Sequence, residues 1–232
     1  MISVVVPSFN EEERIEACLT SLVNQTLPRN RYEIIVVDGG SQDRTREIAE
    51  KYGDLVFIQT SPKVGGARND GALRAKGEIL VTTDADTYLP PDWLERIERD
   101  FDDPEVVMVY GPVRPIERTI KNQFYLFLAN TMAWFGAVSR TIYFTLGCNS
   151  AFRHKEFMDA GMYRVSDAGD DLEIAHRMRA LGTIKFDRNL WVGFSMRRYN
   201  QFGALKSVYE WFYIVFNGGD SDKYAYTRRE YK

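Results

Sequence analysis

The chain has 232 residues, 44% of them hydrophobic and 27% charged, which is typical of one sizeable folded domain and excludes a disordered chain. Its 30 Lys and Arg against 33 Asp and Glu give a net charge of −3, which excludes the basic character of a nucleic-acid-binding protein. Two cysteines exclude a disulfide-rich secreted scaffold, and the opening residues MISVVVPSFN lack the basic region of a signal peptide. We therefore expect a cytoplasmic protein.

Short apolar runs alternate with helical patterns in the first part of the chain. The first run is continuously apolar, as a strand buried on both faces should be. The predicted strands are Ile2–Val6, Glu33–Val37, Leu55–Gln59, Glu78–Thr83 and Val106–Tyr110. The predicted helices run from Asn10 to Val23, around Ile48 as far as Gly53, over Gly66–Ala75, and from Pro91 through Ile97. This alternation predicts right-handed crossovers and an α/β fold whose mostly parallel sheet is flanked by helices.

Two predicted helices begin with the pattern of a capping box, in which a side chain at the helix start accepts a backbone N–H. Asn10 precedes Glu13 by three residues, and Asp170 precedes Glu173 by the same spacing. The second of these helices continues as an apolar stripe as far as Gly182. We expect Asn10 and Asp170 to cap the two helices.

After the fifth strand the pattern changes to a nearly uncharged segment, Phe124–Leu146, in which Arg140 is the single charge. Its length would allow a membrane span, but Arg140 and Asn130 would both be costly in hydrocarbon. Two interpretations stay open: a helical excursion packed on the domain, or a segment that lies on a membrane surface or binds a lipid acceptor. An amphipathic helix over Phe202–Phe216 and a polar tail are predicted to end the chain.

Polar residues follow four of the predicted strands, at ends that should meet along one edge of the sheet. They are Pro7-Ser8-Phe9-Asn10-Glu11, Asp38-Gly39-Gly40-Ser41, Lys63 with Arg68, and Asp84 with Asp86. Ligands of doubly wound sheets bind at this edge, so we expect these side chains to face one crevice. No G-x-G-x-x-G string follows the first strand, which disfavours a dinucleotide oxidoreductase.

Several of these polar residues allow two interpretations. Asp38 is either a turn residue or an acceptor of hydrogen bonds from a base N–H or a ribose hydroxyl. Arg68 is either a solvated helix residue or, in a glycine-rich turn that leads into a helix, a contact for phosphate. Arg197 and Arg198 form either a solvated basic turn or a grip on a diphosphate or a phosphorylated lipid.

Asp84-Ala85-Asp86 directly follows the run Ile-Leu-Val-Thr-Thr, where no structural role requires two charges. Mg²⁺ and Mn²⁺ prefer oxygen ligands, and a diphosphate readily completes their coordination. Such an ion would neutralise the charge that develops on a leaving nucleoside diphosphate. A D-x-D string alone is weak, but its position at a strand end favours a metal site over a polar turn.

Asp171 is not needed for the cap that Asp170 is expected to provide. The adjacent carboxylate would raise the pKa of Asp171 and help it accept a proton from an attacking hydroxyl. On the residues alone, a structural and a catalytic role for Asp171 both stay open.

Taken in order, the motifs of the chain resemble those of the family 2 glycosyltransferases, which have the GT-A fold. The resemblance is carried by VVVPSFNEEERIEACLTSLVNQT, EIIVVDGGSQDRT, GGARNDGALRAKGEILVTTDADTYLPPDWL, GCNSAFRHKEFMDAGMY and GDDLEIAHRMRALG. It runs through Gly182, and the ordered set is far more specific than D-x-D alone.

The resemblance implies a role for each matching residue. The nucleotide site is implied to contain Pro7, Phe9, Glu11, Asp38, Ser41, Arg68 and Asp84. By the same resemblance Asp84 and Asp86 hold Mg²⁺ or Mn²⁺, with Asp86 the more direct ligand. Asp171 is similar in position to the base of an inverting displacement, and Asp170, Arg197 and Arg198 become candidates for acceptor or phosphate contacts.

The chain also departs from the family pattern. It has Asp-Asp where the family motif has Glu-Asp, which keeps both carboxylates. The Q-x-x-R-W string of processive synthases is absent, so we expect transfer of a single sugar. No histidine follows His176, so the late histidine metal ligand of some relatives is missing.

We therefore expect a metal-dependent inverting glycosyltransferase that moves a hexose from a UDP- or GDP-sugar to a hydroxyl acceptor, saccharide or lipid-linked. Residues 1–200 form the GT-A domain, with a nucleotide-binding half (1–110) and an acceptor half (111–200), and residues 201–232 form the amphipathic helix and tail. The alternatives are a dolichol-phosphate-type lipid-phosphate sugar transferase and a non-catalytic nucleotide-sugar-binding module. Apolar segments and basic residues near the C-terminus, among them Arg228, Arg229 and Lys232, also suggest peripheral attachment to the cytoplasmic membrane face or a homodimer.

Overall fold

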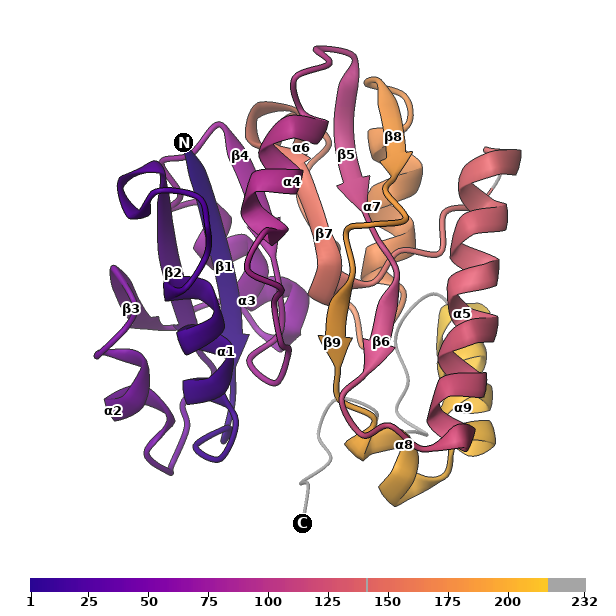
Figure 1. Cartoon of the computed structure of the whole chain (residues 1–232), viewed down its shortest axis with the longest axis horizontal. Coiled ribbons are helices and arrows are strands. Elements are labelled where there is room, and N and C mark those ends of the chain that lie inside the picture. The colour runs from indigo at the N-terminus through magenta and orange to yellow at the C-terminus, as the bar shows by residue number, and fades with distance from the viewer. Residues whose placement is uncertain (141, 217–232) are drawn as a thin grey trace.

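The apolar runs form a seven-stranded mixed sheet with helices on both faces in the computed structural model, which describes residues 1–140 and 142–216 (Figure 1). The strand order is β3-β2-β1-β4-β7-β5-β8. The strands are β1 Ile2–Ser8, β2 Tyr32–Asp38, β3 Leu55–Ile58, β4 Ile79–Thr82, β5 Val106–Tyr110, β7 Ser150–Arg153 and β8 Thr183–Phe186. A separate two-stranded sheet pairs β6 Val113–Pro115 with β9 Val192–Phe194.

Helices of the first part of the chain connect the parallel strands, as predicted. The α-helices are α1 Ile15–Val23, α2 Thr45–Ala49, α3 Lys63–Ala72, α4 Trp93–Asp100, α5 Ile120–Ser139, α6 His154–Asp159, α7 Asp170–Met178, α8 Arg197–Phe202 and α9 Ala204–Phe216. Two 3₁₀ turns are η1 Arg29–Arg31 and η2 Gly147–Asn149. One core cluster packs α1, α2 and α4 on one face of the sheet, and a second packs α3, α6 and α7 on the other.

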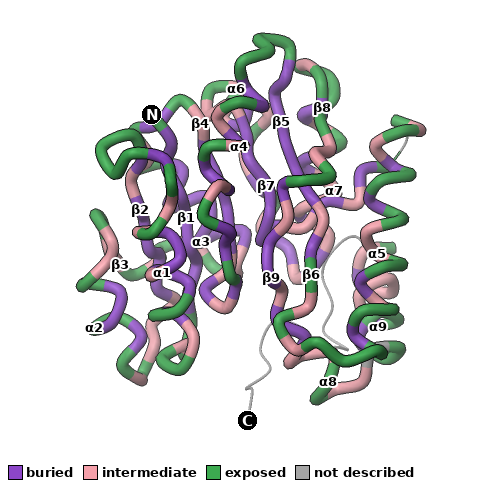
Figure 2. The backbone as a smooth tube through the Cα atoms, viewed as in Figure 1, coloured by how far each residue is buried: buried purple, intermediate pink, exposed green. Residues whose placement is uncertain are grey.

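Side-chain alternation along β1 explains this two-layer arrangement. Val4 and Val6 belong to the cluster on the α1 face, whereas Val5 belongs to the cluster on the α3 face. A strand that is apolar at every position can therefore be covered on both sides. The buried parts of the backbone follow β1, β2, β5 and β7 through the middle of the molecule (Figure 2).

The expected parallel sheet is confirmed for β1, β2, β3 and β4, which pair in parallel. β7 was not predicted, and it enters antiparallel between β4 and β5. β8 then pairs in parallel with β5 at the sheet edge. α3 approaches β1 closely at Gly71, because a Cβ there would lie 2.4 Å from Val5 Cγ1.

The prediction that Asn10 caps the first helix is wrong. α1 begins at Ile15, and the residue before it, Arg14, makes no side-chain cap. Asn10 has a positive φ of 53° and its side chain accepts a hydrogen bond from Gln42 N at 2.9 Å. It ties two loops together because asparagine tolerates the left-handed region and carries a short acceptor.

The last predicted helix is two helices. Gly203, at a φ of 85°, separates α8 from α9, so the helix expected over Phe202–Phe216 begins after that break. Among its apolar side chains, Leu205, Tyr209 and Phe216 are exposed. The predicted tail, with Arg228, Arg229 and Lys232, lies outside the described residues.

The apolar segment after β6 forms α5, whose inner face contacts β6 and β8. Asn130 exchanges two hydrogen bonds with the backbone of Val113, at 2.9 and 2.8 Å. Of the two interpretations of this segment, a helix packed on the domain therefore holds for its inner face. Across residues 1–140 and 142–216, none of the helices combines the length and hydropathy that a membrane crossing demands.

Candidate active site

The turn after β2 is organised by Asp38. Its carboxylate is fully buried and accepts hydrogen bonds from Gly40 N at 3.0 Å, Ser41 N at 2.9 Å and Ser41 Oγ at 2.5 Å. These bonds fix the Gly39-Gly40-Ser41 loop, in which Gly40 has a φ of 87°. The buried Asp38 thus fixes the conformation of the loop, whereas Ser41 is partly exposed to solvent.

The end of β1 supplies an aromatic ring and a carboxylate. Pro7 is buried within the strand, and the ring of Phe9 beyond it is 57% exposed. A Cβ on Gly39 would lie 3.2 Å from that ring, so the neighbouring loop needs a small residue there. Glu11 is partly buried, its backbone N–H donates to Thr45 Oγ1 at 2.7 Å, and its carboxylate pairs with Arg197.

Asp84 and Asp86 lie just beyond β4, as predicted, and both are half-buried. Asp84 Oδ1 accepts a hydrogen bond from Arg68 at 2.9 Å, and Asp86 Oδ2 lies 3.3 Å from Arg197 Nε. Burial, and then the charge of Asp84, raise the pKa of Asp86 above its ordinary value. Two arginines therefore stand against two carboxylates at this strand end.

Arg68 lies within α3, inside the helix predicted over Gly66–Ala75, but it is buried, so it is neither a solvated helix residue nor part of a turn before the helix. Its guanidinium contacts Asp84, and at 3.3 Å it also contacts both Asp170 and Asp171. The ring of Tyr163 lies 5.4 Å from the guanidinium carbon. One cation therefore joins the carboxylate at the end of β4 to the two carboxylates at the start of α7.

Asp171 lies in the first turn of α7 and has a defined set of partners. Its Oδ2 accepts the backbone N–H of Gly147 at 3.0 Å, and its Oδ1 faces Arg68. Burial, and then the charge of Asp170, raise the pKa of Asp171 to about 7. A carboxylate with a pKa near neutrality can accept a proton in one step and release it in the next.

Asp170 does not cap α7, so this prediction is wrong. The cap position is Gly169, at a φ of 83°, and no side chain caps the helix there. The carboxylate of Asp170 is buried against Arg68, and burial raises its pKa. Glu173 pairs with Arg177 in place of the predicted capping box.

Arg197 reaches the site from α8, far along the chain. It pairs with Glu11 and lies beside Asp86. Burial, opposed by the hydrogen bond from Arg197, raises the pKa of Glu11 to about 7. Glu117 holds the turn before Arg197, because it accepts the backbone N–H of Met196 at 2.8 Å. Arg198 follows on the same helix and is half-buried.

The fit of a divalent ion depends on a second ligand. Within residues 1–140 and 142–216, no group of three or more His, Cys, Asp or Glu side chains could hold an ion alone. The donor set at Asp84 and Asp86 is nevertheless all oxygen, which suits Mg²⁺ or Mn²⁺. The nearby Glu11 Oε2 is buried and accepts no hydrogen bond from the described residues. The residues fit an ion whose remaining ligands come from a bound diphosphate and water.

Most of the predicted residues converge at one edge of the sheet. Arg68 links Asp84 to Asp171, and Arg197 links Asp86 to Glu11. Sequence reasoning missed three supports of the site, Gly147, Tyr163 and Glu117. For Gly147 the available signal was its place in the GCNSAF string that resembles the family motif. The structure shows why a glycine is needed there, because a Cβ would lie 2.3 Å from Arg68. Glu117 carries no signal of its own.

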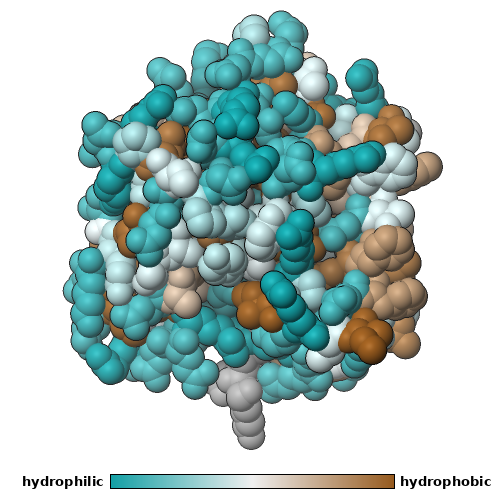
Figure 3. Space-filling model, in the orientation of Figure 1, coloured by the Kyte–Doolittle hydropathy of each residue, from teal (hydrophilic) through white to brown (hydrophobic). Residues whose placement is uncertain are grey.

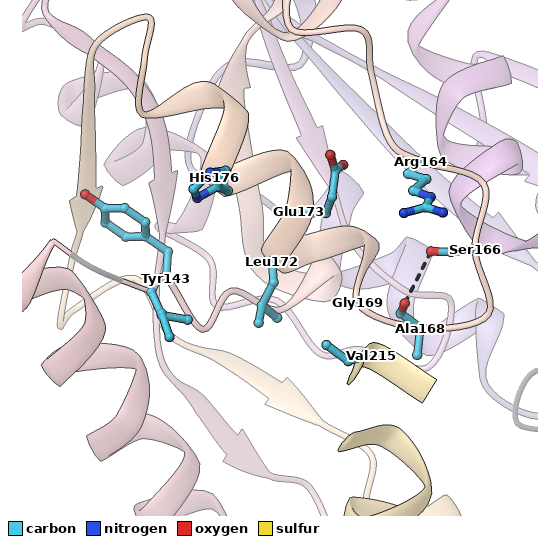
Figure 4. A pocket seen from close by; sticks show the side chains of 10 residues that line it. Tyr143, Arg164, Ser166, Ala168, Gly169, Leu172, Glu173, His176 and Val215 are labelled. Carbon is cyan, nitrogen blue, oxygen red and sulfur yellow. Dashed lines mark hydrogen bonds between the residues drawn. The ribbon is translucent and has the colours of Figure 1, made fainter. Parts of the chain in front are cut away.

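A cavity of about 330 Å³ lies beside α7 but does not contain these carboxylates. Leu172, Glu173 and His176 line it, with Tyr143 and Val215 from neighbouring segments (Figure 4). At about 100° per residue these α7 positions face away from Asp170 and Asp171. The cavity is therefore separate from the carboxylate site.

Comparison with known proteins gives the same assignment as the motifs. The family described as Glycosyl transferase family 2 matches residues 3–161. The glycosyltransferase AglE of Haloferax volcanii is 41% identical over 101 residues, which are 41% of this chain and 33% of the relative. A poly(ribitol-phosphate) beta-glucosyltransferase of Bacillus spizizenii is 42% identical over 102 residues, which are 41% of this chain and 16% of that protein. The chain thus spans a third or less of these two relatives.

Solved structures share the fold. The mannosyltransferase PcManGT of Pyrobaculum calidifontis, in complex with GDP-Man and Mn²⁺, aligns with a TM-score of 0.70 at 24% identity, over 94% of this chain and 64% of that one. This confirms the predicted GT-A fold. Because the family match covers more than half of the chain, including Arg68, Asp84 and Asp86, this protein belongs to glycosyl transferase family 2.

Proposed function

We propose that this protein transfers a single hexose, with inversion, from a UDP- or GDP-sugar to a hydroxyl acceptor. The observation that carries the proposal is the shared cation: Arg68 contacts Asp84 at 2.9 Å and Asp171 at 3.3 Å. A metal-type carboxylate and a base-type carboxylate thus lie within the reach of one guanidinium. We propose that the anomeric carbon lies beside this pair, between a bound diphosphate and an attacking hydroxyl.

The nucleoside is proposed to lie over the ends of β1 and β2. The exposed ring of Phe9 offers a stacking surface for a base. Ser41 offers a hydroxyl, and the buried Asp38 and Pro7 hold the two loops that present it. Residues 1–110 are accordingly proposed as the nucleotide-binding half and 111–200 as the acceptor half, with the C-terminal helix as an appendage.

The diphosphate is proposed to lie between Asp84, Asp86 and the arginines. Asp84 and Asp86 would hold Mg²⁺ or Mn²⁺, which would neutralise charge on the departing diphosphate. Arg197 and Arg198 are proposed to contact the same phosphates, which would release Glu11 and Asp86 from Arg197. The relative in complex with GDP-Man and Mn²⁺ supports this choice of donor and ion.

Asp171 is proposed as the base. The acceptor hydroxyl passes its proton to Asp171 while its oxygen bonds to the anomeric carbon. The bond from that carbon to the diphosphate oxygen breaks on the opposite face, so the configuration inverts. Gly147 N and Arg68 orient the Asp171 carboxylate, and burial, followed by the charge of Asp170, keeps its pKa high enough to hold the proton.

The acceptor could instead be a lipid phosphate, and one observation favours this second candidate. The outer face of α5 is apolar and exposed, which suits a reaction beside a membrane. A phosphate acceptor is already ionised and needs no base, so loss of the Asp171 carboxylate would then be tolerated.

We propose that the reaction takes place in the cytoplasm, because Cys18 and Cys148 are buried free thiols, as is usual in a reducing compartment.

A thermal-shift screen of UDP, GDP, dTDP and CDP sugars, with Mn²⁺ or with EDTA, tests the proposal first. A donor at 100 times its dissociation constant should stabilise the fold by roughly 2.7 kcal/mol. Release of nucleoside diphosphate in the presence of hydroxyl acceptors then separates an enzyme from a non-catalytic binding module. Donor binding without turnover on any acceptor, or even slow hydrolysis, would favour the module.

A further inference from the structure

α5 presents an apolar face to solvent, which is the reverse of an ordinary surface helix. Its buried positions are Asn122, Leu126, Ala133 and Gly136. The opposite face consists of side chains that are between 38% and 89% exposed, and we call this set the outer ridge: Ile120, Phe124, Phe127, Leu128, Trp134, Phe135 and Val138. At about 100° per residue these seven positions fall within about a third of the helix circumference. Thr131 is the polar residue that interrupts them.

The ridge cannot turn inward, because three contacts fix the other face of α5. Asn130 is bonded in both directions to the backbone of Val113. Tyr110 Oη donates to the carbonyl of Ala133 at 2.9 Å. A Cβ on Gly136 would lie 2.0 Å from the carbonyl of Ile142, so the following segment presses on the helix there. The helix is therefore held with its apolar side outward.

The exposed apolar residues gather on the side of the molecule where α5 lies, visible as the brown and tan area at the right of Figure 3. α9 adds exposed apolar side chains of its own, Leu205 at 78% and Phe216 at 82%. A surface of this kind on a soluble domain marks an interaction site.

The charged side chains on α5 and at its two ends, from Arg118 to Arg140, are of one sign. No Asp or Glu occurs between Arg118 and Lys155, although the whole chain carries a net charge of −3. Arg118 and Lys121 are exposed at the start of the ridge, and Arg140 is exposed at its end. Cations thus border both ends of the apolar face, with no acidic side chain on α5 to neutralise them.

This charge pattern distinguishes a bilayer from a second copy of the chain. In an antiparallel pairing of two ridges, Lys121 of one copy would face Arg140 of the other, and in a parallel pairing like residues would meet. Either arrangement opposes cation to cation, which disfavours an isologous dimer. Anionic headgroups would satisfy the cations at both ends at once.

We infer that the outer ridge of α5 docks on an anionic lipid bilayer. The helix lies in the plane of the interface, with Phe127 and Phe135 entering the acyl boundary and Lys121 and Arg140 at the headgroups. It does not need to leave the protein, because its inner face stays on β6 and β8. Sugar transfer would then take place beside the membrane, but the docking itself requires no donor or acceptor.

Flotation with vesicles tests the docking surface on the intact chain. We expect binding to vesicles that contain phosphatidylglycerol in phosphatidylcholine, stronger at low than at high salt. The double variant Phe127→Ser/Phe135→Ser should weaken binding at least about tenfold, since two large apolar side chains no longer enter the bilayer. The matched control is Leu73→Ser, a side chain 58% exposed just after α3 and away from the ridge, which should bind like the unaltered chain.

The charge contribution is measured separately. Arg118→Gln and Lys121→Gln should each lower affinity for phosphatidylglycerol vesicles by roughly fivefold. They should leave any weak binding to pure phosphatidylcholine unchanged. Circular dichroism and thermal unfolding of every variant check that the fold is retained.

Either of two vesicle results would overturn the inference. One is an unaltered chain that stays in the soluble fraction with anionic vesicles at low salt. The other is equal loss of binding in the ridge variant and in Leu73→Ser. If the chain instead sediments as a dimer that Phe127→Ser/Phe135→Ser dissociates, the ridge is an interface between copies. Because no sugar donor is present, a negative result leaves the proposed transfer activity standing.

Discussion

The two halves of the molecule reach their functional residues by different routes. In residues 1–110 most of the polar clusters lie at the end of the strand that positions them, as Asp38 ends the apolar run of β2. In residues 111–216 the important contacts join distant parts of the chain, as when Arg197 of α8 pairs with Glu11. The first half is therefore a prebuilt surface, whereas the second half is assembled on it. The carboxylates with raised pKa values lie where the two halves meet.

The largest effect is expected at Asp171, the base contributed by the assembled half. Asp171→Asn keeps the shape and removes the proton acceptor, so turnover on a hydroxyl acceptor should fall roughly 10²–10⁴-fold. Donor affinity, measured by calorimetry, should hardly change. Asp170→Asn is the comparison variant: it keeps the base but removes a charge that helps raise the pKa of Asp171, so turnover should fall less and its pH profile should shift to lower pH. Unchanged turnover in Asp171→Asn would favour the lipid-phosphate acceptor.

The metal motif of the prebuilt half gives the next effect. Asp86→Ala should abolish the gain in nucleoside-diphosphate affinity that Mn²⁺ provides, a loss of at least about tenfold, or 1.4 kcal/mol. The fold should persist, because Asp86 is half-buried and is not part of either hydrophobic core cluster. Titration of UDP and GDP with Mn²⁺ and with EDTA is the measurement. Identical affinities of the unaltered protein under the two conditions would remove the metal from the proposal.

The pH dependence of turnover reports on the junction between the halves. With the pKa of Asp171 at about 7, the base is protonated below neutrality. Turnover should therefore fall by about tenfold per pH unit below that point and level off above it. A profile that stays flat from about two pH units below neutrality to about one unit above it would place the titrating group elsewhere.

Stability should move in the opposite direction to activity. Burial raises the pKa of Glu11 from 4.5 to about 7, so between these values the folded protein keeps a proton that the unfolded chain releases. This stabilisation is present at low pH and is lost as the pH rises through about 7. Glu11→Gln should thus stabilise the metal-free protein above neutrality by on the order of 1–3 kcal/mol. Denaturant unfolding in EDTA measures the difference, and a destabilised variant would contradict it.

The smallest effect is expected on stability, when glycine replaces a residue with positive φ in each half. Arg140 ends α5 with a φ of 54°, which a glycine adopts without strain, so Arg140→Gly should stabilise the fold by about 0.5 kcal/mol. Asn10 has a similar φ, but its side chain bonds to Gln42 N. Asn10→Gly should therefore bring no gain or a small loss. Equal shifts in the two midpoints would mean that the Asn10 contact contributes nothing.

The prebuilt half was predictable because its signals are local. Apolar runs of strand length and the polar residues that end them lie next to each other, so β1 to β4 and the two aspartates of Asp84-Ala85-Asp86 could be placed in advance. The small residue Gly71 of α3 is likewise visible in the sequence, and the helix approaches β1 closely there. The capping of α1 was misjudged because Asn10 found a partner in another loop, a contact that spacing along the chain does not encode.

The assembled half was harder for a physical reason. β7 is four residues long and only becomes a strand between β4 and β5. Asp170 matches a capping box, yet its carboxylate turns to Arg68, 102 positions away. The apolar surface of α5 gives no periodic inward stripe, so sequence could predict a helix but not which face would be covered.

The position of β7 has a consequence for how the chain folds during synthesis. β5 has no edge of the main sheet to join until β7 lies beside β4, since β7 separates the two. A nascent chain that has emerged only as far as Tyr110 therefore exposes the open edge of β4 and an unpaired apolar strand. Such edges recruit strands from other molecules. The N-terminal half should be a poor independent fragment, prone to aggregate when expressed alone, and dependent on chaperones until the ribosome delivers Arg153.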